Sequence, residues 1–213
     1  MRRVRLMSTL THHPRVSTGR VWIFSGKHGS SKKTGTDNKM PVDLNNLVFS
    51  KLTETTDVSM FRCSDSEDLQ DFLNSAAKEN QIQKISTTYV VHLGPELVAF
   101  FSLSMGCIKS EFVNRKMTLE MDDPPNSYPA LLLARIATRD GYRGQGIGRE
   151  MMKRVFSIAF DLTEQIGCRF VKVDAKKDPR TIRFYEKNGG FVRIHENNES
   201  IQMVVDLTKI PHE

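Results

Sequence analysis

The sequence predicts an α/β fold: one domain whose mixed, mostly antiparallel central sheet is flanked by helices, with a flexible N-terminal extension. Three observations lead to this prediction. Segments rich in β-branched and aromatic residues alternate along the chain with segments whose apolar residues have the period of a helix. A near-continuous apolar run, ALLLARIAT at 130–138, is typical of a central strand covered on both faces. The 213 residues, of which 38% are hydrophobic, suffice to form a core.

The first 40 residues differ from the rest of the chain in charge. Residues 1–40 contain nine Lys and Arg and one Asp, a net charge of +8, whereas the whole chain carries +6. The remaining 41–213 therefore has a net charge of −2. We expect 1–40 to be a basic, disordered extension and 41–213 to be the folded domain. A dispensable tail, a polyanion-binding arm, a targeting segment and sequence upstream of the true start are the open interpretations of 1–40.

The first half of the domain is predicted to form a helix and then a β-hairpin. Apolar residues recur at i, i+3, i+4, i+7 and i+8 over 69–77, which predicts an amphipathic helix that ends near Gln81. The segments 86–93 (STTYVVHL) and 97–103 (LVAFFSL) are β-branched and aromatic, and the Gly-Pro pair between them favours a turn. The polar, Pro-rich stretch 109–128 that follows is predicted to be a long loop.

The second half is predicted to alternate strands with two helices. Apolar residues spaced as on one face of a helix predict a long helix, and Gly167 is placed to end it as a left-handed C-terminal cap. Asp178 and Pro179 are typical of the first residues of a second, shorter helix. The predicted elements are a helix at 147–166, a strand at 169–174, a helix from 178 to about 188, and strands at 191–194 and 201–207.

A glycine-rich segment, RGQGIG at 143–148, lies between the 130–138 strand and the long helix. Its glycines let successive N–H groups point into one concavity, and the start of the helix adds unpaired N–H groups and the positive end of its dipole. Such a turn is suited to bind a phosphate. Spacing excludes two common nucleotide loops. A P-loop ends in Gly-Lys-Ser/Thr, and a dinucleotide-binding loop requires a third glycine where Arg149 stands.

The spacing R-x-x-G-x-G in this segment resembles the pyrophosphate loop of the GNAT superfamily of acyl-CoA-dependent N-acetyltransferases. A second likeness is RFYEKNG at 183–189, which is similar to the family's helix ending F-Y-E-K-x-G-F, with Gly190 as an extra residue before Phe191. The resemblance covers about 60–208. The segments SEDLQDFLNSAAKENQ, TTYVV, AFFSLS and QMVVDL resemble a small bacterial and archaeal branch, which includes toxins that acetylate aminoacyl-tRNA.

The resemblance implies an N-acetyltransferase that passes the acetyl group of acetyl-CoA to a primary amine by direct attack, without a metal. Tyr185 would protonate the departing CoA thiolate, since a phenol with a pKa of about 10 is a suitable donor. Backbone groups of the strand end and of the glycine turn would hold the coenzyme. The implied coenzyme-binding residues are Ile136, Ala137, Thr138, Arg143, Gly144, Gln145, Gly146, Ile147 and Gly148.

The general base stays open, because the carboxylates near the predicted site are in loops or at strand ends. They are interpreted as surface charges, with a water chain as the alternative to a dedicated base. Asp178 occupies the position at which the family often has an Asn that contacts pantetheine, and it is interpreted as a helix cap. The base candidates are Glu96, Glu111 and Glu120. The cations interpreted either as an RNA-facing patch or as a solvated helix face are Arg149, Lys153 and Arg154.

The acceptor amine is that of an aminoacyl-tRNA, a protein or a small molecule, and these alternatives stay open. The basic extension and the likeness to the toxins favour tRNA, whereas the near-neutral domain does not. The toxin branch also implies an antitoxin-like partner, and an open sheet edge admits a homodimer. Three widely spaced cysteines and the lack of a long apolar run predict a cytoplasmic protein with no role for the membrane. A non-catalytic CoA-binding module that regulates or binds a partner is the alternative function.

Overall fold

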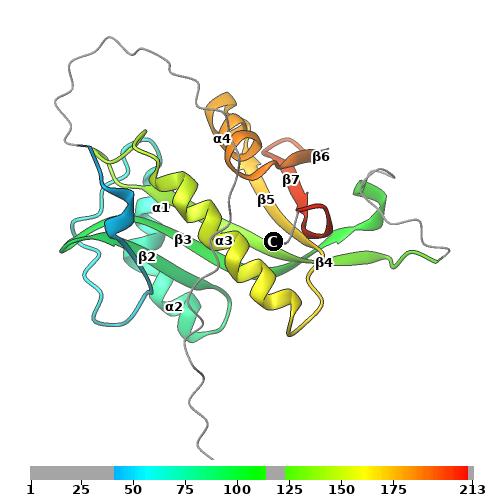
Figure 1. The fold of residues 1–213 in the computed structure, drawn as a ribbon, viewed down its shortest axis with the longest axis horizontal. Coiled ribbons are helices and arrows are strands. Elements are labelled where there is room, and N and C mark those ends of the chain that lie inside the picture. Colours follow the sequence, from blue (N-terminus) through cyan, green and yellow to red (C-terminus); the bar gives the residue numbers. More distant parts are fainter. Residues whose placement is uncertain (1–40, 114–122, 211–213) are drawn as a thin grey trace, which may run out of the picture. The chain divides into compact units, whose positions relative to one another are not determined.

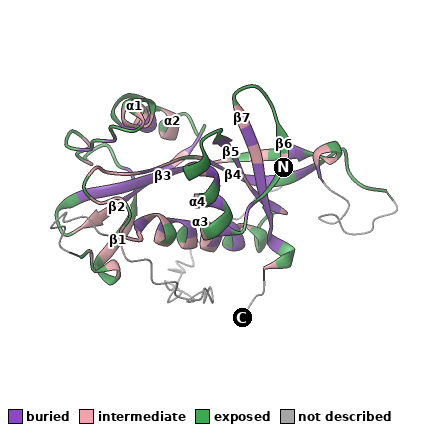
Figure 2. Cartoon of the chain, turned by 90° about the horizontal axis from the view of Figure 1, so that it is seen from above, coloured by how far each residue is buried: buried purple, intermediate pink, exposed green. Residues whose placement is uncertain are grey.

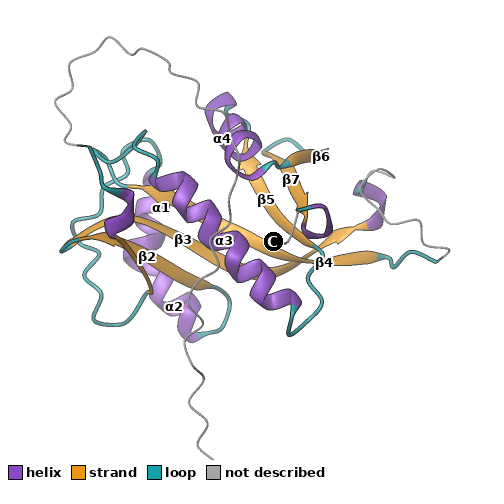
Figure 3. Cartoon of the chain, viewed as in Figure 1, coloured by secondary structure: helices purple, strands orange, loops and turns teal. Residues whose placement is uncertain are grey.

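A seven-stranded mixed sheet is the centre of the protein. The structure, a computed structural model, describes residues 41–113 and 123–210, so the predicted extension at 1–40 lies outside the described residues. The strands are ordered β1-β2-β3-β4-β5-β7-β6, and only the β4–β5 pair is parallel. Their bounds are β1 (Leu47–Lys51), β2 (Thr87–Leu93), β3 (Glu96–Lys109), β4 (Ser127–Thr138), β5 (Phe170–Lys176), β6 (Val192–Glu196) and β7 (Ser200–Asp206) (Figure 1, Figure 3).

Helices cover both faces of this sheet. A helix built from α1 (Glu67–Asp71), a π-helical turn (Phe72–Ala76) and α2 (Ala77–Ile82) lies on one face. The other face is covered by α3 (Ile147–Thr163) and α4 (Pro179–Gly189) (Figure 2). The predicted α/β fold with a mixed, mostly antiparallel sheet is confirmed. None of the described helices is both long enough and apolar enough to cross a membrane.

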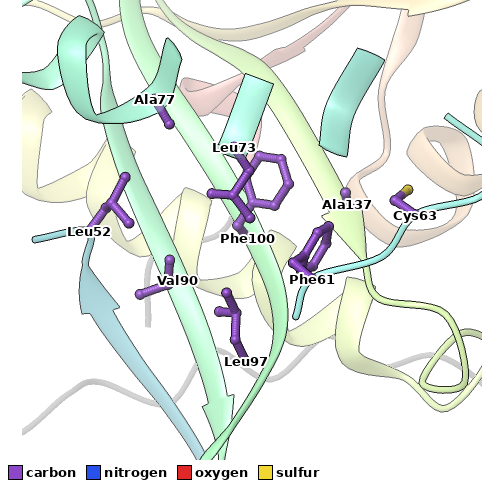
Figure 4. Packing of buried hydrophobic residues seen from close by; sticks show 9 residues of the cluster. All are labelled: Leu52, Phe61, Cys63, Leu73, Ala77, Val90, Leu97, Phe100 and Ala137. Carbon is purple, nitrogen blue, oxygen red and sulfur yellow. The ribbon is translucent and has the colours of Figure 1, made fainter. Parts of the chain in front are cut away.

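One part of the core lies between the α1–α2 helix and strands β2 and β3. Phe61 and Phe100 are fully buried there, with ring centroids 5.3 Å apart in an edge-on arrangement. Leu73 and Ala77 reach the same cluster from the helix (Figure 4). The π-helical turn adds a residue to one helical turn, and the apolar side chains on both sides of it still face the sheet. The period seen over 69–77 is therefore the core-facing side of this helix, as predicted.

Two strands differ from their predictions because their pairing is non-local. The edge strand β1 was not predicted, and it forms by antiparallel pairing with β2. Strand β3 extends to Lys109, six residues past the predicted end, because its second half pairs with β4 down to Ser127. The predicted long loop at 109–128 is shortened at both ends by this pairing. The hairpin itself is confirmed, with Gly94 in the turn between β2 and β3 at φ 59°.

The end of the long helix differs from the prediction, and the end of α4 is set by a glycine for which no role was predicted. The prediction that Gly167 caps the long helix is wrong, since α3 ends at Thr163 and Gly167 does not have a left-handed backbone. Gly190 has that conformation instead, at φ 65°, and its N–H donates to the Glu186 carbonyl where α4 ends. The extra glycine of the second signature is therefore a helix cap.

A buried ion pair joins the start of β5 to the end of β7. The Arg169 guanidinium donates to both carboxylate oxygens of Asp206, at 2.9 and 2.8 Å, and the Asp206 side chain is 2% exposed. Asp206→Ala would take the carboxylate away from a largely buried guanidinium, so we expect the free energy of unfolding to fall by about 3–5 kcal/mol. Chemical denaturation measures this loss. Asp161→Ala, at an exposed position of α3, is the control, with a change below about 0.5 kcal/mol. Equal losses in the two variants would contradict the prediction.

Candidate functional site

Strands β4 and β5 are paired over only three residues each. Ala130–Leu132 pair with Phe170–Lys172, and beyond this point β4 runs toward the start of α3 while β5 runs toward the start of α4 (Figure 1). A β-bulge lies just past the last pair, where Leu133 and Arg135 of β4 oppose consecutive residues of β3. A bulge bends and twists its strand, which favours the separation. The opening between β4 and β5 is lined by strand edges that do not pair with each other.

The strand-end residues predicted to contact the coenzyme lie along this opening. Ile136, Ala137 and Thr138 are the last residues of β4, beyond its last pair with β5. Ala137 packs into the hydrophobic cluster under the α1–α2 helix. The Thr138 carbonyl accepts a hydrogen bond from the Arg143 side chain at 3.2 Å. What this part of β4 offers a ligand is therefore its backbone edge rather than its side chains.

The glycine turn presents a row of unused backbone donors. Within the described part of the chain, the backbone N–H groups of residues 143 to 148 donate no hydrogen bond. The first such bond at the start of α3 is made by Arg149, whose N–H donates to the Gly146 carbonyl at 3.0 Å. Consecutive unpaired donors at the N-terminus of a 17-residue helix form an anion-binding arrangement.

Glycine is required at two positions of this turn. Gly144 and Gly146 have φ values of 77° and 92°, in the left-handed region that disfavours a side chain. At Gly146, which is the N-cap of α3, a Cβ would also lie 3.0 Å from the Leu44 Cδ1 atom. At Gly148, a Cβ would lie 2.7 Å from the Phe184 ring, so α3 and α4 approach closely here. The residues present therefore fit a diphosphate held by the N–H groups of the turn.

Polar contacts from two distant segments hold the turn and the loop before it. The Gln145 side-chain oxygen accepts from the Val42 N–H at 3.2 Å. Glu96, at the start of β3, accepts from the Tyr142 hydroxyl at 2.7 Å and from the Arg139 guanidinium at 3.0 Å. The hydrogen bond to Glu96 raises the pKa of Tyr142, because the phenolate could not donate it. The carboxylate considered as a base candidate is thus bound to the loop that precedes the turn.

The Arg143 side chain is engaged by groups of the protein itself. Its guanidinium pairs with the carboxylates of Asp65 and Asp140, the latter at 2.8 Å. Sequence reasoning expected Arg143 to bind the coenzyme and missed these partners. Nothing in the local pattern indicates them, because Asp65 precedes α1 and meets the turn only in the folded chain.

Tyr185 lies on the buried face of α4. Its side chain packs edge-on against Phe184 and Phe191, with ring centroids 5.2 and 5.5 Å apart. Phe184 is the ring that approaches Gly148, so Tyr185 is one residue away from the contact between α4 and the glycine turn. Burial raises the pKa of Tyr185 well above its ordinary value, because an apolar surrounding disfavours the phenolate. The phenol therefore keeps its proton at neutral pH.

The remaining carboxylates singled out in the sequence have structural partners or lie outside the described residues. Asp178 caps α4, as predicted, and accepts from the Thr181 N–H at 2.9 Å. This hydrogen bond lowers the pKa of Asp178. Glu111 pairs with Lys109 at an exposed site. Glu120 lies outside the residues that the structure describes.

The cations of α3 and α4 differ in their partners. On α3, Arg149 and Lys153 both contact Glu150, at 3.4 and 3.0 Å. On α4, Arg183 and Lys187 are exposed, four residues apart on one side of the helix, and neither forms an ion pair with a described carboxylate. Arg154, further along α3, is exposed and forms no ion pair with a described carboxylate either. Cations without a carboxylate partner are therefore found on α4 and at Arg154, whereas those in the first two turns of α3 are paired.

An anion-binding turn beside an opened strand pair suits a transferase that must hold the diphosphate and the long arm of an acyl-CoA. Residues 70–191 match the acetyltransferase (GNAT) family. This range is more than half of the chain, and the protein belongs to that family. It is an acyl-CoA-dependent N-acetyltransferase whose cosubstrate is acetyl-CoA, as the resemblance in the sequence implied.

Relatives of known activity and structure place the chain near acetyltransferase toxins. It is 26% identical to the tRNA-acetylating toxin of Mycobacterium tuberculosis (strain ATCC 25618 / H37Rv) over 128 residues, which cover 60% of this chain and 75% of the toxin. AtaT complexed with acetyl-methionyl-tRNAfMet has a TM-score of 0.68 at 20% identity, covering 77% of this chain and 96% of its own. A tyrosine-to-phenylalanine mutant of AtaT, bound to the C-terminus of the antitoxin AtaR and acetyl-CoA, has a TM-score of 0.62 at 20% identity, covering 77% and 95%. The resemblance to the toxin branch is confirmed by these similarities.

Proposed function

We propose that the chain acetylates the amino group of an aminoacyl-tRNA. Its similarity to the tRNA-acetylating toxin, and the likeness of its fold to AtaT with acetyl-methionyl-tRNAfMet, support this acceptor class. An antitoxin-like protein is the second partner that we propose, supported by the likeness to AtaT bound to the C-terminus of AtaR.

The proposed reaction is a direct attack of the neutral amine on the thioester of acetyl-CoA. The amine nitrogen forms a bond to the carbonyl carbon, the carbon–sulfur bond breaks, and the amine loses a proton to solvent. Tyr185 gives its phenolic proton to the departing CoA sulfur, and the phenolate then takes up a proton from solvent, which balances the proton lost by the amine. The place of Tyr185 on α4, one residue from the ring that meets Gly148, supports this role, and the phenol is protonated at neutral pH. No covalent link to the protein forms in this scheme.

The unpaired N–H groups of 143–148 are the observation that carries the proposal. They would hold the diphosphate, and the backbone edge of β4 at Ile136–Thr138, with which β5 does not pair, would bind the arm of the coenzyme and the acetyl carbonyl. Orientation of two reactants in one opening lowers a barrier by as much as about 7–11 kcal/mol. One backbone N–H directed at the developing negative charge contributes about 3 kcal/mol more.

Charge on and around α4 supports RNA as the partner. Residues 172–193 carry seven Lys and Arg and three Asp and Glu, a net charge of +4, in a domain whose net charge is −2. Arg183 and Lys187 lie on the exposed side of α4, roughly opposite Tyr185 on its buried side. In the proposed complex, this exposed side contacts the phosphate backbone while the aminoacyl end enters the opening.

Neutralising this side of α4 tests the RNA contact. Arg183→Gln/Lys187→Gln is expected to weaken tRNA binding and to make the slope of log K against log salt shallower by about two, one for each phosphate that these side chains no longer neutralise. Fluorescence anisotropy with labelled tRNA over a salt series measures both. Lys51→Gln/Lys84→Gln removes the same charge at two other exposed positions and should leave the slope unchanged. Equal effects in the two pairs would contradict a specific contact at α4.

The acceptor itself is tested by following the acetyl group. With labelled acetyl-CoA, we expect label to enter charged tRNA and not uncharged tRNA, peptides or polyamines. Mild alkaline hydrolysis should then release the label as an N-acetyl amino acid. Transfer to peptides or polyamines, with none to charged tRNA, would contradict the proposed acceptor and leave the family's reaction in place.

A further inference from the structure

The guanidinium of Arg143 is nearly saturated by protein acceptors. Its Nε donates to the Thr138 carbonyl at 3.2 Å. One terminal nitrogen contacts Asp140 Oδ1 at 2.8 Å and Cys63 Sγ at 3.3 Å, and the other pairs with Asp65. An arginine has five N–H donors, and these contacts account for four of them. The side chain is 30% exposed, so little of it is available to a further ligand.

The partners of Arg143 come from two segments that are far apart in the sequence. Thr138 and Asp140 lie at the end of β4 and in the loop that leads to the glycine turn. Cys63 and Asp65 lie in the segment that leads into α1, and Cys63 packs in the hydrophobic cluster under the α1–α2 helix (Figure 4).

Backbone hydrogen bonds join the same two segments independently of Arg143. The Asp140 N–H donates to the Arg62 carbonyl at 2.9 Å, and the Ser64 N–H donates to Asp140 Oδ2 at 3.0 Å. The segment at 62–65 and the loop before the glycine turn therefore form one hydrogen-bonded unit with Arg143 at its centre.

We propose that Arg143 is a positioning residue, which shapes the glycine turn for the coenzyme by tying it to Asp65, rather than a ligand of the coenzyme's phosphates. This inference rests on the proposal that the N–H groups of 143–148 bind the diphosphate. Arg143 is the first residue of this series of N–H groups. The contacts that hold its side chain therefore also hold the backbone from which the glycine turn starts. The positive field at the phosphates then comes from the N–H groups and the α3 dipole.

Removing the Asp65 carboxylate distinguishes the two roles of Arg143, because one role predicts weaker CoA binding and the other predicts CoA binding that is unchanged or tighter. If Arg143 positions the turn, Asp65→Asn should weaken CoA binding by about tenfold, the effect of losing one charge-assisted hydrogen bond. If Arg143 is a phosphate ligand, Asp65→Asn frees it from a competing carboxylate, and CoA should bind equally or more tightly. Isothermal titration calorimetry with CoA measures this constant, and unchanged or tighter binding would overturn the inference.

Glu67→Gln is the matched control for charge. Glu67 is exposed, two residues from Asp65, and its change removes the same negative charge from the same segment without touching Arg143. Its CoA affinity should stay at the wild-type value or rise slightly, since CoA is an anion. Asp65→Glu keeps the carboxylate and should bind CoA more tightly than Asp65→Asn does.

A structural readout separates positioning from a general loss of fold. In Asp65→Asn, amide hydrogen exchange at Asp140 and Arg149, whose N–H groups are hydrogen-bonded on either side of the turn, should become faster while exchange in β5 and β7 stays as in the wild type. Faster exchange throughout the described sheet would mean global destabilisation and would overturn the inference. Failure of the underlying site is recognised separately: if Gly146→Glu binds CoA normally, the glycine turn is not the coenzyme site, whatever Asp65→Asn does.

Discussion

Tyr185→Phe is expected to lower the rate of acetyl transfer by about 10²- to 10⁴-fold, the range found when a general acid is removed. The substitution removes one oxygen and keeps the ring that packs between Phe184 and Phe191. CoA affinity should stay at the wild-type value, because the proposed binding groups are backbone atoms of β4 and the glycine turn. Single-turnover kinetics with acetyl-CoA and charged tRNA, together with calorimetry for CoA, measure the two quantities separately.

Tyr128→Phe is the matched control for this experiment. Tyr128 is also a buried tyrosine, 6% exposed, and it packs edge-on against Phe170 in a different part of the core. Its hydroxyl has no hydrogen-bond partner in the described part of the chain, so removing it should leave both transfer and CoA binding unchanged. A Tyr185→Phe enzyme as fast as Tyr128→Phe would mean that another group, or water, protonates the sulfur. Full CoA binding with no turnover in the wild type would instead favour a non-catalytic CoA-binding module.

The direction of the Tyr185 pKa shift sets the expected pH dependence. A general acid works in its protonated form, and burial raises the pKa of Tyr185 above the ordinary value of about 10. The donor therefore stays protonated as the pH rises from 6 to 8, a range in which the aminoacyl ester of the acceptor survives the assay. We expect the transfer rate to rise over that range as the acceptor amine loses its proton, with no fall attributable to Tyr185. A fall in rate near pH 8 that disappears in Tyr185→Phe would contradict this assignment.

The glycine turn could be predicted from the sequence because the information for it is local. The run at 143–148 follows a buried strand and begins an amphipathic helix, and positive φ at Gly144 and Gly146 is a property of those residues alone. Asp178 as a helix cap is local in the same way, since its carboxylate bonds to a backbone N–H three residues on. The α/β class followed from the same kind of pattern.

The surroundings of the turn could not be predicted, because they depend on contacts between distant parts of the chain. Asp65 reaches Arg143, Leu44 packs over Gly146, and Glu96 holds Tyr142 only after the sheet has formed. The same reason explains why β1 was missed, since its pairing with β2 joins segments far apart in the sequence. A pattern indicates which residues can bind a phosphate, whereas the groups that shape them are set by the tertiary fold.

Gly146→Glu is expected to abolish measurable CoA binding, with a loss of affinity of more than about 100-fold. Three effects add in the same direction. The φ of 92° strains any L side chain, and the new Cβ would lie 3.0 Å from Leu44 Cδ1, so the turn must change shape. The carboxylate also brings a negative charge next to N–H groups that would otherwise receive the diphosphate. Calorimetry with CoA measures the loss.

Gly146→Ala and Gly167→Glu separate the contribution of backbone strain to the loss of CoA affinity from the contribution of the added charge. Gly146→Ala keeps the strain and the approach to Leu44 without the charge, and we expect an intermediate loss of CoA affinity. Gly167→Glu adds the same carboxylate at an exposed glycine whose Cβ would meet nothing within 4 Å and whose φ is not positive, so CoA should bind as in the wild type. Circular dichroism and thermal unfolding check that each variant is folded. Wild-type CoA affinity in a folded Gly146→Glu protein would mean that the coenzyme does not bind at the glycine turn. The roles proposed for β4 and Tyr185 would then be wrong as well, because both depend on that position of the coenzyme.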